Sequence, residues 1–514
     1  MKKLPIGIQN FEKIRLDGYF YIDKTEEIFN LISTGSYYFL SRPRRFGKSL
    51  LLSTIKAFFE GKRELFKGLA IDRLAEDWTP RPILYLDLNS RMYSEPESLK
   101  QELNKHLEAW EKIYGDEYKD RAIEERFYHI VAKACQQTGH RVVILVDEYD
   151  KPMLQAIGNE RLQEAYRNTL KAFYGALKSR DGDIKFAMLT GVTKFGKVSV
   201  FSDLNNLMDI SMDARYYDIC GVSEGELYAN FAEDIAGLAK AQGMTDEECR
   251  AELARMYDGY HFKENTPGMY NPFSLLNTFA KREFGSYWFE TGTPSYLVKL
   301  LKAHNYDLNE MANQVTTADA LNCIDAAPNN PIPVIYQSGY LTIKGYDREF
   351  GTYTLGFPNE EVGKGFVNYL VPFYTPVKEG KSMFEIGNFV REVRSGDADA
   401  FFKRLKGFFA DIPYEMQRDI EVHYQNVLFI VFKLMGFYTE VEYRTAAGRV
   451  DLVLKTDSYI YVMEFKLNGT AEQAIEQIES KGYAEPFAAD GRKVVKAGVG
   501  FSKAQKTIEK WIVE

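Results

Sequence analysis

The chain has 514 residues, of which 45% are apolar and 27% are charged. This length exceeds what a single hydrophobic core usually holds, so we expect about three or four domains of ordinary globular composition. The formal net charge of -8 excludes a bulk electrostatic attraction to nucleic acid. Any nucleic-acid site must therefore be a local basic patch on an acidic protein.

The cysteines and the N-terminus indicate a cytoplasmic protein. Cys135, Cys220, Cys249 and Cys323 lie far apart, with neither zinc-ligand spacing nor the pattern of a disulfide framework. Buried thiols in a reducing compartment are the preferred interpretation. The N-terminal residues carry two lysines but no apolar segment or cleavage site of a signal peptide. No apolar run approaches the length of a membrane span, so we expect no membrane partner.

The first polar segment of interest is Asp23-Lys24-Thr25. It precedes a helical pattern that runs through Ile28, Leu31 and Ile32. Acids directly after Thr25 are typical of a helix start. Contact with a nucleotide base is the other interpretation, and the sequence leaves both open.

The next segment has the order strand, tight loop and helix. An aromatic and apolar run over residues 37–40 predicts a buried strand, and residues 50–59 have helical spacing. Between them lies Ser41-Arg-Pro-Arg-Arg-Phe-Gly-Lys-Ser49. A loop that ends in Gly-Lys-Ser between a strand and a helix is the setting of a P-loop. Backbone N–H groups at the helix N-terminus would hold phosphate oxygens there.

The residue types of this loop suit a nucleotide with its magnesium ion. Lys48 would reach the β- and γ-phosphates, and the Ser49 hydroxyl would ligate Mg²⁺. The general pattern has glycine where this chain has Arg42, which leaves the loop's shape open but keeps its positive charge. A basic turn on a surface helix is the alternative. The candidate nucleotide-binding residues are Arg44, Arg45, Phe46, Gly47, Lys48 and Ser49.

Two further strands follow, and the second ends on carboxylates. Residues 82–88 read as a buried strand, and residues 142–146 are apolar and mostly β-branched, as in a strand covered on both faces. Asp147 and Glu148 come next, at the strand end where open α/β sheets place their ligands. Asp147 fits a residue that holds Mg²⁺ through the loop serine, and Glu148 fits a base that orients the attacking water. A strand that ends in a solvated turn is the alternative, which the preceding P-loop disfavours.

A strand over residues 184–193 and a largely helical region come next. Thr190 lies where a sensor of the γ-phosphate would be expected, although a hydroxyl at a strand end is also ordinary turn chemistry. Residues 223–283 are mostly helical, with aromatic turns at 257–262 and 270–273 that we interpret as packing elements. Strands over 333–344 and 352–357 would form a hairpin. Helices followed by a hairpin predict a winged-helix fold, which could bind DNA or act as a lid or spacer.

The last hundred residues carry a different set of charges. A helix is predicted over 421–436, followed by strands over 448–455 and 459–467. Asp451 and Glu464 each interrupt an apolar strand, and Lys466 shares a strand face with Glu464. Two facing carboxylates with a lysine suit a divalent metal, an activated water and a phosphodiester. Oxygen ligands point to Mg²⁺ or Mn²⁺.

Other residues of this region have weaker indications. Gln477, on the next predicted helix, could contribute to the site, whereas His423 fits a surface or core residue better than a ligand. A β-hairpin with alternating solvated charges is the alternative interpretation of the acids. Apolar residues on both faces around each acid count against it.

Together these residues resemble a known arrangement. Asp23-Lys24-Thr25, the Arg42–Ser49 loop and Val146-Asp-Glu-Tyr-Asp-Lys-Pro152 resemble an AAA-ATPase-like family found in many bacteria. The last hundred residues resemble the PD-(D/E)xK nuclease superfamily domain often fused to it, although Val450 stands where that motif has proline. The nuclease resemblance implies a catalytic set of Glu421, Asp451, Glu464, Lys466 and Gln477.

We therefore expect an α/β protein with a P-loop NTPase parallel sheet, a helical and winged-helix middle region, and a restriction-endonuclease-like C-terminal domain. The expected domains are 1–219, 220–384 and 385–514. The first functional hypothesis is an ATP- and Mg²⁺-dependent DNA endonuclease, in which the ATP state gates cleavage. The second is a non-cleaving ATP switch that binds nucleic acid or a partner. The nucleic acid is expected to be DNA rather than RNA, and self-association stays open.

Overall fold

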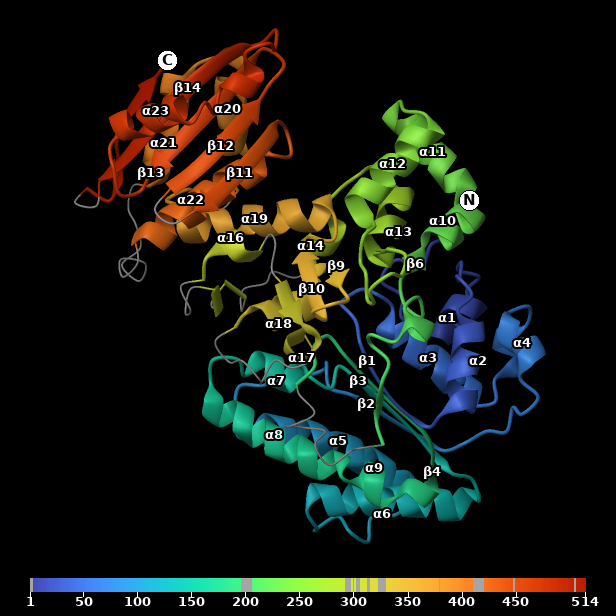
Figure 1. Cartoon of the computed structure of the whole chain (residues 1–514). Coiled ribbons are helices and arrows are strands. Elements are labelled where there is room, and N and C mark those ends of the chain that lie inside the picture. The colour runs from blue at the N-terminus through green and yellow to red at the C-terminus, as the bar shows by residue number, and fades with distance from the viewer. Residues whose placement is uncertain are drawn as a thin grey trace. The chain divides into compact units, whose positions relative to one another are not determined.

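A computed structural model describes most of the chain and divides it into two compact units (Figure 1). One unit comprises Met1–Thr293 with Val315–Glu361, and the other comprises Pro294–Gln314 with Val362–Glu514. The expected boundaries near residues 219 and 384 stay a prediction. The side chains of residues 310, 420, 443–446 and 449–451 are not described. The described ranges are 3–195, 206–291, 297–298, 300–301, 306–311, 315–321, 330–378, 380–409, 420–446, 449–502 and 505–514.

The first unit is built around a five-stranded parallel sheet with the order β2-β3-β4-β1-β5. All residues of β3 are buried, as expected for a parallel strand covered on both faces. The strand order separates β1, which precedes the P-loop, from β3 by one strand, β4. The strands are β1 (Tyr37–Ser41), β2 (Ile83–Asp87), β3 (Val142–Asp147), β4 (Ile184–Gly191) and β5 (Met208–Asp209).

Helices pack on this sheet through apolar residues at helical spacing. Leu99, Leu103 and Leu107 of α5 are fully buried in a core shared with β2 and β3. Figure 1 shows α5, α6 and α8 along one side of the strands. The helices are α1 (Phe11–Leu16), α2 (Thr25–Thr34), α3 (Lys48–Phe59), α4 (Ala70–Leu74), α5 (Pro96–Tyr114), α6 (Ile123–Thr138), α7 (Lys151–Gln155), α8 (Glu160–Tyr174) and α9 (Ala176–Ser179), with 3₁₀ turns at Arg63–Phe66, Asp181–Asp183 and Ala214–Tyr216.

A helical region with its own core follows the parallel sheet. Leu227, Ile235 and Leu253 are among the buried residues that join its helices. Two short strands, β6 and β7, pair antiparallel within it. Its elements are β6 (Val222–Ser223), α10 (Glu224–Asn230), α11 (Ala232–Gln242), α12 (Asp246–Tyr257), β7 (Met269–Tyr270), α13 (Pro272–Lys281) and α14 (Tyr287–Glu290).

The region where the sequence predicts a winged helix contains a three-stranded antiparallel sheet with the order β8-β10-β9 and two short helices, and the winged-helix assignment itself stays a prediction. One boundary was wrong: residues 332–337 form helix α18 rather than the start of a strand. Prolines near its first turn favour that helix start. Most of α18 is buried, so this helix cannot enter a DNA groove. The elements are β8 (Val315–Thr317), α17 (Ala318–Leu321), α18 (Ile332–Gln337), β9 (Thr342–Asp347) and β10 (Thr352–Gly356).

The second unit holds a mixed five-stranded sheet with the order β11-β12-β13-β14-β15. β13 and β14 are parallel, and the other neighbours are antiparallel. Its elements are α16 (Leu308–Met311), α19 (Glu360–Tyr374, whose first two residues belong to the first unit), α20 (Ser382–Ser395), α21 (Ala398–Phe408), α22 (Ile420–Met435), β11 (Glu440–Ala446), β12 (Arg449–Lys455), β13 (Tyr459–Lys466), α23 (Ala471–Ser480), a 3₁₀ turn (Glu485–Phe487), β14 (Lys493–Ser502) and β15 (Thr507–Val513).

Two glycines of β14 allow helix α23 to lie directly on the sheet. A Cβ at Gly498 would come 2.5 Å from the Ala471 carbonyl oxygen, and one at Gly500 would come 2.8 Å from the Ala471 nitrogen. Gly498 pairs with Glu464 and Gly500 with Lys466 across β13 and β14. The start of α23 is therefore held beside the two charged residues of β13.

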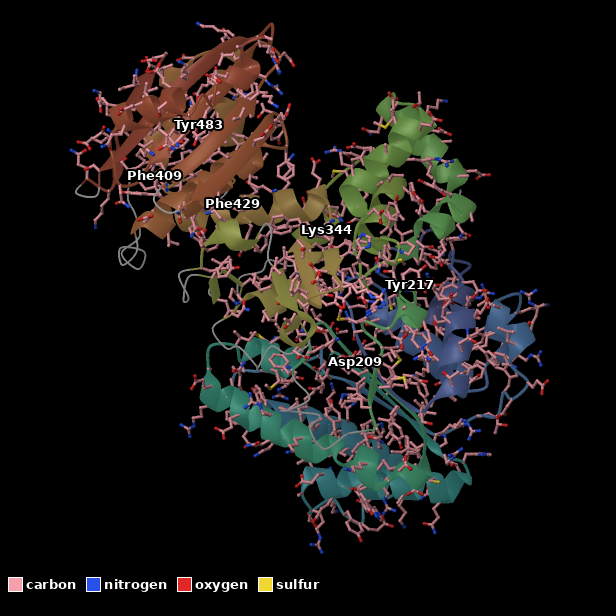
Figure 2. The ribbon with its side chains drawn as sticks, viewed as in Figure 1. Asp209, Tyr217, Lys344, Phe409, Phe429 and Tyr483 are labelled. Atoms are coloured by element: carbon pink, nitrogen blue, oxygen red, sulfur yellow. The ribbon has the colours of Figure 1, made fainter. Side chains whose placement is uncertain are left out.

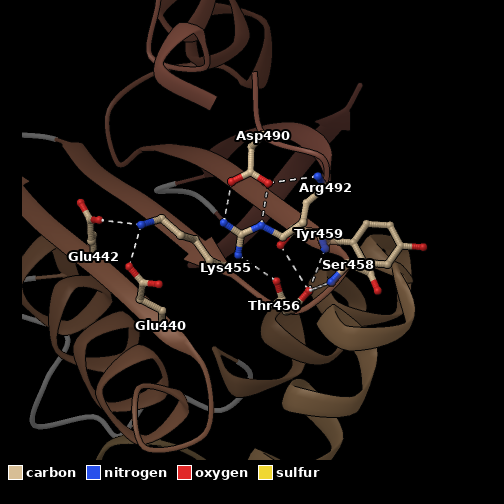
Figure 3. A network of polar contacts seen from close by, with 8 residues as sticks. All are labelled: Glu440, Glu442, Lys455, Thr456, Ser458, Tyr459, Asp490 and Arg492. Atoms are coloured by element: carbon tan, nitrogen blue, oxygen red, sulfur yellow. Dashed lines mark hydrogen bonds and ion pairs between the residues drawn. The ribbon is translucent and has the colours of Figure 1, made fainter. Parts of the chain in front are cut away.

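A polar network at the other end of this sheet fixes the β12–β13 turn (Figure 3). The Thr456 hydroxyl accepts from the Tyr459 N–H at 2.9 Å, and Arg492 donates to the Thr456 carbonyl at 3.1 Å. Lys455 contacts both Glu440 and Glu442 of the edge strand. Turn geometry sets strand register, and the register here brings position 451 opposite position 464.

Candidate active sites

The loop before α3 bends at residues with positive φ. Gly47, the N-cap of α3, has φ 98°, and Arg45 has φ 65°. No atom of the described residues lies within 4 Å of a Cβ built at Gly47, so the backbone angle rather than space favours glycine there. The Lys48 ammonium donates to the carbonyls of Arg42 at 2.9 Å and Pro43 at 3.1 Å. The loop thus folds around its own lysine at the start of a helix.

Aromatic residues from the middle region contact the side chains of this loop. The Arg44 guanidinium lies 4.8 Å from the centre of the Trp288 ring, and Arg45 lies 4.8 Å from that of Phe273. Phe46 packs edge-on against Tyr260, with ring centres 4.7 Å apart. The aromatic turns that the sequence indicated as packing elements therefore pack on the candidate nucleotide loop itself.

The acidic side of the site lies at the ends of β3 and β4. The Asp147 carboxylate accepts from the Thr190 hydroxyl at 2.8 Å and from the Glu148 N–H at 3.1 Å. Asp147 is 5% exposed and Thr190 is fully buried. Because β4 lies between β1 and β3, Thr190 is placed between the loop strand and Asp147. The structure thus brings together the two strand-end residues that the sequence proposed.

Glu148 has an unusual backbone and an unusual environment. Its φ is 53°, in the left-handed region that few residues other than glycine adopt. Burial raises the pKa of its carboxyl, the charge of Lys48 opposes that rise, and the charges of Asp150 and Asp147 add to it. Strained backbone and a raised carboxyl pKa together are characteristic of functional positions.

Asp150 is a residue that the sequence interpretation missed. It is fully buried and accepts from the Thr193 N–H at 2.6 Å and from the Thr193 hydroxyl at 2.5 Å. Burial raises the pKa of its carboxyl. Asp150 therefore ties the turn after β3 to the end of β4. In the sequence, Asp150 could have been recognised as a third carboxylate, three positions after Asp147.

A mostly apolar pocket opens beside Gly47, with a cavity volume of about 110 Å³. It is lined by Tyr21, Ile22, Lys24, Phe46, Leu50 and Cys220, among others. The Lys24 ammonium pairs with Glu226 at 2.6 Å, whereas Asp23 accepts from the N–H groups of Thr25 and Ala70. Asp23 therefore stabilises the helix start, as one interpretation of Asp23-Lys24-Thr25 expects, and the contact with a nucleotide base stays a prediction.

The second candidate site lies on β13 under the start of α23. The Glu464 side chain is fully buried, and Lys466 donates to it at 2.9 Å. The Lys466 ammonium also donates to the Gln477 side-chain oxygen. The Gln477 amide nitrogen is buried without a partner among the described residues. The structure therefore brings together Glu464, Lys466 and Gln477.

Asp451 lies opposite Glu464 by strand register. Directly paired residues of neighbouring strands share one face of the sheet, so position 451 is adjacent to the same site. The Asp451 side chain is outside the described part of the structure. Within the part that is described, no group of three His, Cys, Asp or Glu could hold a metal ion. A metal at this site would need the Asp451 carboxylate together with Glu464.

A residue of helix α22 contacts the turn directly after β13. Glu421 accepts from the Asn468 amide at 2.9 Å, and Asn468 follows Lys466 by two positions. Asn468 was missed by the sequence interpretation, because it lies in the turn after β13, where strand periodicity gives no signal. His423 is 2% exposed, and burial lowers its pKa to about 4. It is therefore a neutral core residue, consistent with the sequence interpretation.

Two protein-family models match this chain. The family described as a predicted AAA-ATPase matches residues 5–201, and the PD-(D/E)XK nuclease superfamily matches residues 419–511. A protein of Azotobacter chroococcum mcd 1, described as an uncharacterized protein in the vnfD 5' region, is 36% identical over 526 residues, which cover 100% of this chain and 99% of that protein. The chain therefore belongs to a family of predicted AAA-ATPases with a C-terminal PD-(D/E)XK nuclease superfamily domain.

Among solved structures, the chain has a distant likeness to the ORC2 protein of Aeropyrum pernix in ADPNP and ADP complexes. The match covers 65% of this chain and 87% of that chain at 9% identity, with a TM-score of 0.18. In the described residues, no helix has both the length and the apolar character needed to cross a membrane.

Proposed function

We propose that the chain is an ATP- and metal-dependent DNA endonuclease in which the first unit binds and hydrolyses ATP. The main support for ATP binding and hydrolysis is the strand order of the parallel sheet in the first unit. It lines up the loop lysine, Thr190 and Asp147 at the carboxyl edge of one parallel sheet. Lys48 is also near enough to Glu148 to influence its pKa. Free Cys135, Cys220 and Cys249 fit a reducing, cytoplasmic setting.

Each residue of this edge has a proposed role. Lys48 and the N–H groups at the start of α3 would hold the phosphates, with Arg44 and Arg45 flanking them. The Ser49 hydroxyl and the Asp147 carboxylate are oxygen donors that fit Mg²⁺, which would neutralise phosphate charge when bound. Glu148, whose carboxyl pKa is raised, would orient the attacking water and take its proton. Thr190 would sense the γ-phosphate through Asp147.

The apolar pocket beside Gly47 supports the nucleotide assignment. Base-sized ligands bind in concave, mostly apolar sites with few polar groups. The pocket begins where the phosphate loop ends, and Lys24 supplies a polar group at its wall. We assign it to the nucleotide base.

In the second unit, Asp451 and Glu464 are proposed to hold a divalent metal, Mg²⁺ or Mn²⁺. When bound, that metal would activate the water that attacks a DNA phosphodiester. Lys466 would stabilise the charge that develops on the phosphate. The side-chain N–H of Gln477, which has no partner among the described residues, would be a second donor, and Glu421 would support the site through Asn468.

A physical link supports gating of cleavage by the ATP state. The Trp288 indole N–H donates to the Arg44 carbonyl at 2.9 Å, and the Trp288 main-chain N–H donates to Glu361 at 2.6 Å. Glu361 lies in the first turn of α19, which continues into the second unit. A movement of the phosphate loop would therefore reach the helix that leads to the nuclease sheet.

The experiment that tests this function is incubation of the purified chain with plasmid DNA, Mg²⁺ and ATP. Cleavage that disappears in Asp451→Ala supports the endonuclease. The net charge of -8 and the buried helix α18 count against DNA recognition by the first unit and leave room for a second candidate, a non-cleaving ATP switch that binds nucleic acid or a partner. That candidate predicts metal-independent DNA retention, equal in wild type and Asp451→Ala, without cutting.

A further inference from the structure

Arg42 occupies the position where the general P-loop pattern has glycine, and its side chain is buried. It is 1% exposed. Its Nη1 donates to the Ser211 carbonyl at 2.8 Å and to its neighbour Ser41 at 3.0 Å, and its Nη2 donates to the Tyr216 carbonyl at 3.0 Å. A buried charge is costly unless it is well hydrogen-bonded, so these contacts are what makes the position tenable.

The Arg42 guanidinium also contacts an aromatic ring of the middle region. The guanidinium carbon, Cζ, lies 4.0 Å from the centre of the Phe262 ring, within the range of a cation–π interaction. Phe262 packs edge-on against Phe46 of the loop, with ring centres 5.4 Å apart. Arg42 thus joins the loop both to Phe262 and to the segment after β5. Asp209 and Tyr217, labelled in Figure 2, border that segment.

The main chain of Arg42 contacts the catalytic edge of the sheet. Its N–H donates to the Gly191 carbonyl at 3.2 Å, directly after Thr190 on β4. Its carbonyl accepts from the Lys48 ammonium at 2.9 Å. A displacement of Arg42 would therefore move the contact that holds Lys48.

The backbone at position 42 has no need of glycine. Positive φ angles in this loop occur at Arg45 and Gly47 and not at Arg42. A glycine at position 42 would supply freedom that the loop does not use. Burial lowers the pKa of Arg42 to about 10, so the guanidinium keeps its charge near neutral pH.

We propose that Arg42 is a positioning residue of the nucleotide site, which fixes the phosphate loop and Lys48 through the carbonyls of residues 211–216 and the ring of Phe262. This proposal rests on the proposed nucleotide binding. It predicts that restoring the general pattern, by Arg42→Gly, impairs the loop rather than improving it. Because Lys48 would contact the β- and γ-phosphates, the loss should fall on nucleotides that carry those phosphates.

The experiment is calorimetric titration of ATP, ADP and AMP into the full chain and its variants. Arg42→Gly should lower the affinity for ATP and ADP by about tenfold or more, with AMP affinity within about twofold of wild type. Arg42→Lys keeps the charge but has fewer donors, so its affinities for ATP and ADP should lie between those of wild type and Arg42→Gly. Phe262→Leu, which leaves the loop sequence intact, should show the same selective loss to a smaller degree.

Arg215→Gly is the matched control, since Arg215 is an exposed arginine of the same segment. It should leave all three affinities unchanged. Arg42 is no positioning residue if Arg42→Gly and Phe262→Leu bind ATP as tightly as wild type. An equal loss for ATP and AMP in both folded variants would overturn the proposal too, because it would reflect general damage. A wild-type chain that binds none of the three nucleotides would refute the proposed nucleotide site itself.

Discussion

The two proposed sites, the ATP site of the first unit and the nuclease site of the second unit, both combine a lysine with carboxylates carried by strands, but they are assembled differently. The ATP site combines a loop after β1 with the ends of β3 and β4, which are far apart in the sequence. The nuclease site rests on two neighbouring antiparallel strands and one helix. The first should therefore depend on distant anchors such as the contacts of Arg42 with residues 211–216 and with Phe262. The second should depend mainly on local register.

The largest effect is expected from Glu464→Gln, which tests the local character of the nuclease site. Loss of the charge should lower plasmid cleavage by about a thousandfold or more, because a metal ligand and the partner of Lys466 are both weakened. ATP hydrolysis should be unchanged. Glu479→Gln, on the exposed surface of α23, is the control and should cleave as wild type does. Residual cleavage near the wild-type rate in Glu464→Gln would exclude this site.

Lys48→Ala is expected to have the next largest effect. Removal of the loop lysine should lower ATP hydrolysis by about a hundredfold or more, measured as phosphate release. Lys56→Ala changes a lysine on the same helix whose side chain is 43% exposed, and it should hydrolyse ATP normally. Equal rates in the two variants would show that the loop is not the ATP site.

Trp288→Phe separates nucleotide binding from its transmission to α19. The variant loses the indole N–H that contacts the Arg44 carbonyl. ATP affinity should change by less than about threefold, whereas stimulation of cleavage by ATP should fall several-fold. Because Trp288 contacts the loop, we expect ATP binding to change the tryptophan fluorescence of wild type and of Trp110→Phe, but not that of Trp288→Phe. Full stimulation in Trp288→Phe would rule out this route.

The smallest expected effect is on stability and concerns Glu361. Burial raises the pKa of this carboxyl to about 7, and the charge of Glu290 adds to the rise. Hydrogen bonds from the Ser274 hydroxyl and from the N–H groups of Trp288 and Phe289 oppose it. Between the unfolded pKa and about 7, the unfolded chain binds fewer protons than the folded one. The free energy of unfolding should therefore fall as pH rises through this window.

Glu361→Gln removes this titration. Between pH 5 and 8, the free energy of unfolding should fall by about 2 kcal/mol less in the variant than in wild type. Urea unfolding at several pH values measures the difference. A wild type and a variant with parallel pH profiles would show that Glu361 is not held protonated by its surroundings.

The sequence predicted those parts of each site that depend on local pattern. The strand ending at Asp147 was visible as an apolar run, and Gly47-Lys48-Ser49 was visible as a motif before a helix. Glu464 and Lys466 were found because strand periodicity puts them on one face. These features need only a few consecutive residues to be recognised.

Contacts between distant segments could not be predicted in this way. From the sequence, Arg42 was only a positive charge where the general P-loop pattern has glycine, and its partners at residues 211–216 and 262 could not be foreseen. The segment that forms helix α18 was predicted as part of a strand, because the apolar run Ile332-Pro-Val-Ile-Tyr suits a strand or a buried helix equally well. Its packing in the fold makes it a helix. Asp150 gained its role from Thr193, whose position depends on the pairing of β3 and β4.

The most direct test of the account is single-turnover plasmid cleavage with Mg²⁺, in the presence and absence of ATP, by wild type and Lys48→Ala. We predict that ATP accelerates cleavage by wild type and has no effect on Lys48→Ala, whose nuclease residues are intact. Equal cleavage by both proteins, with or without ATP, would contradict the claim that the two sites act in one reaction.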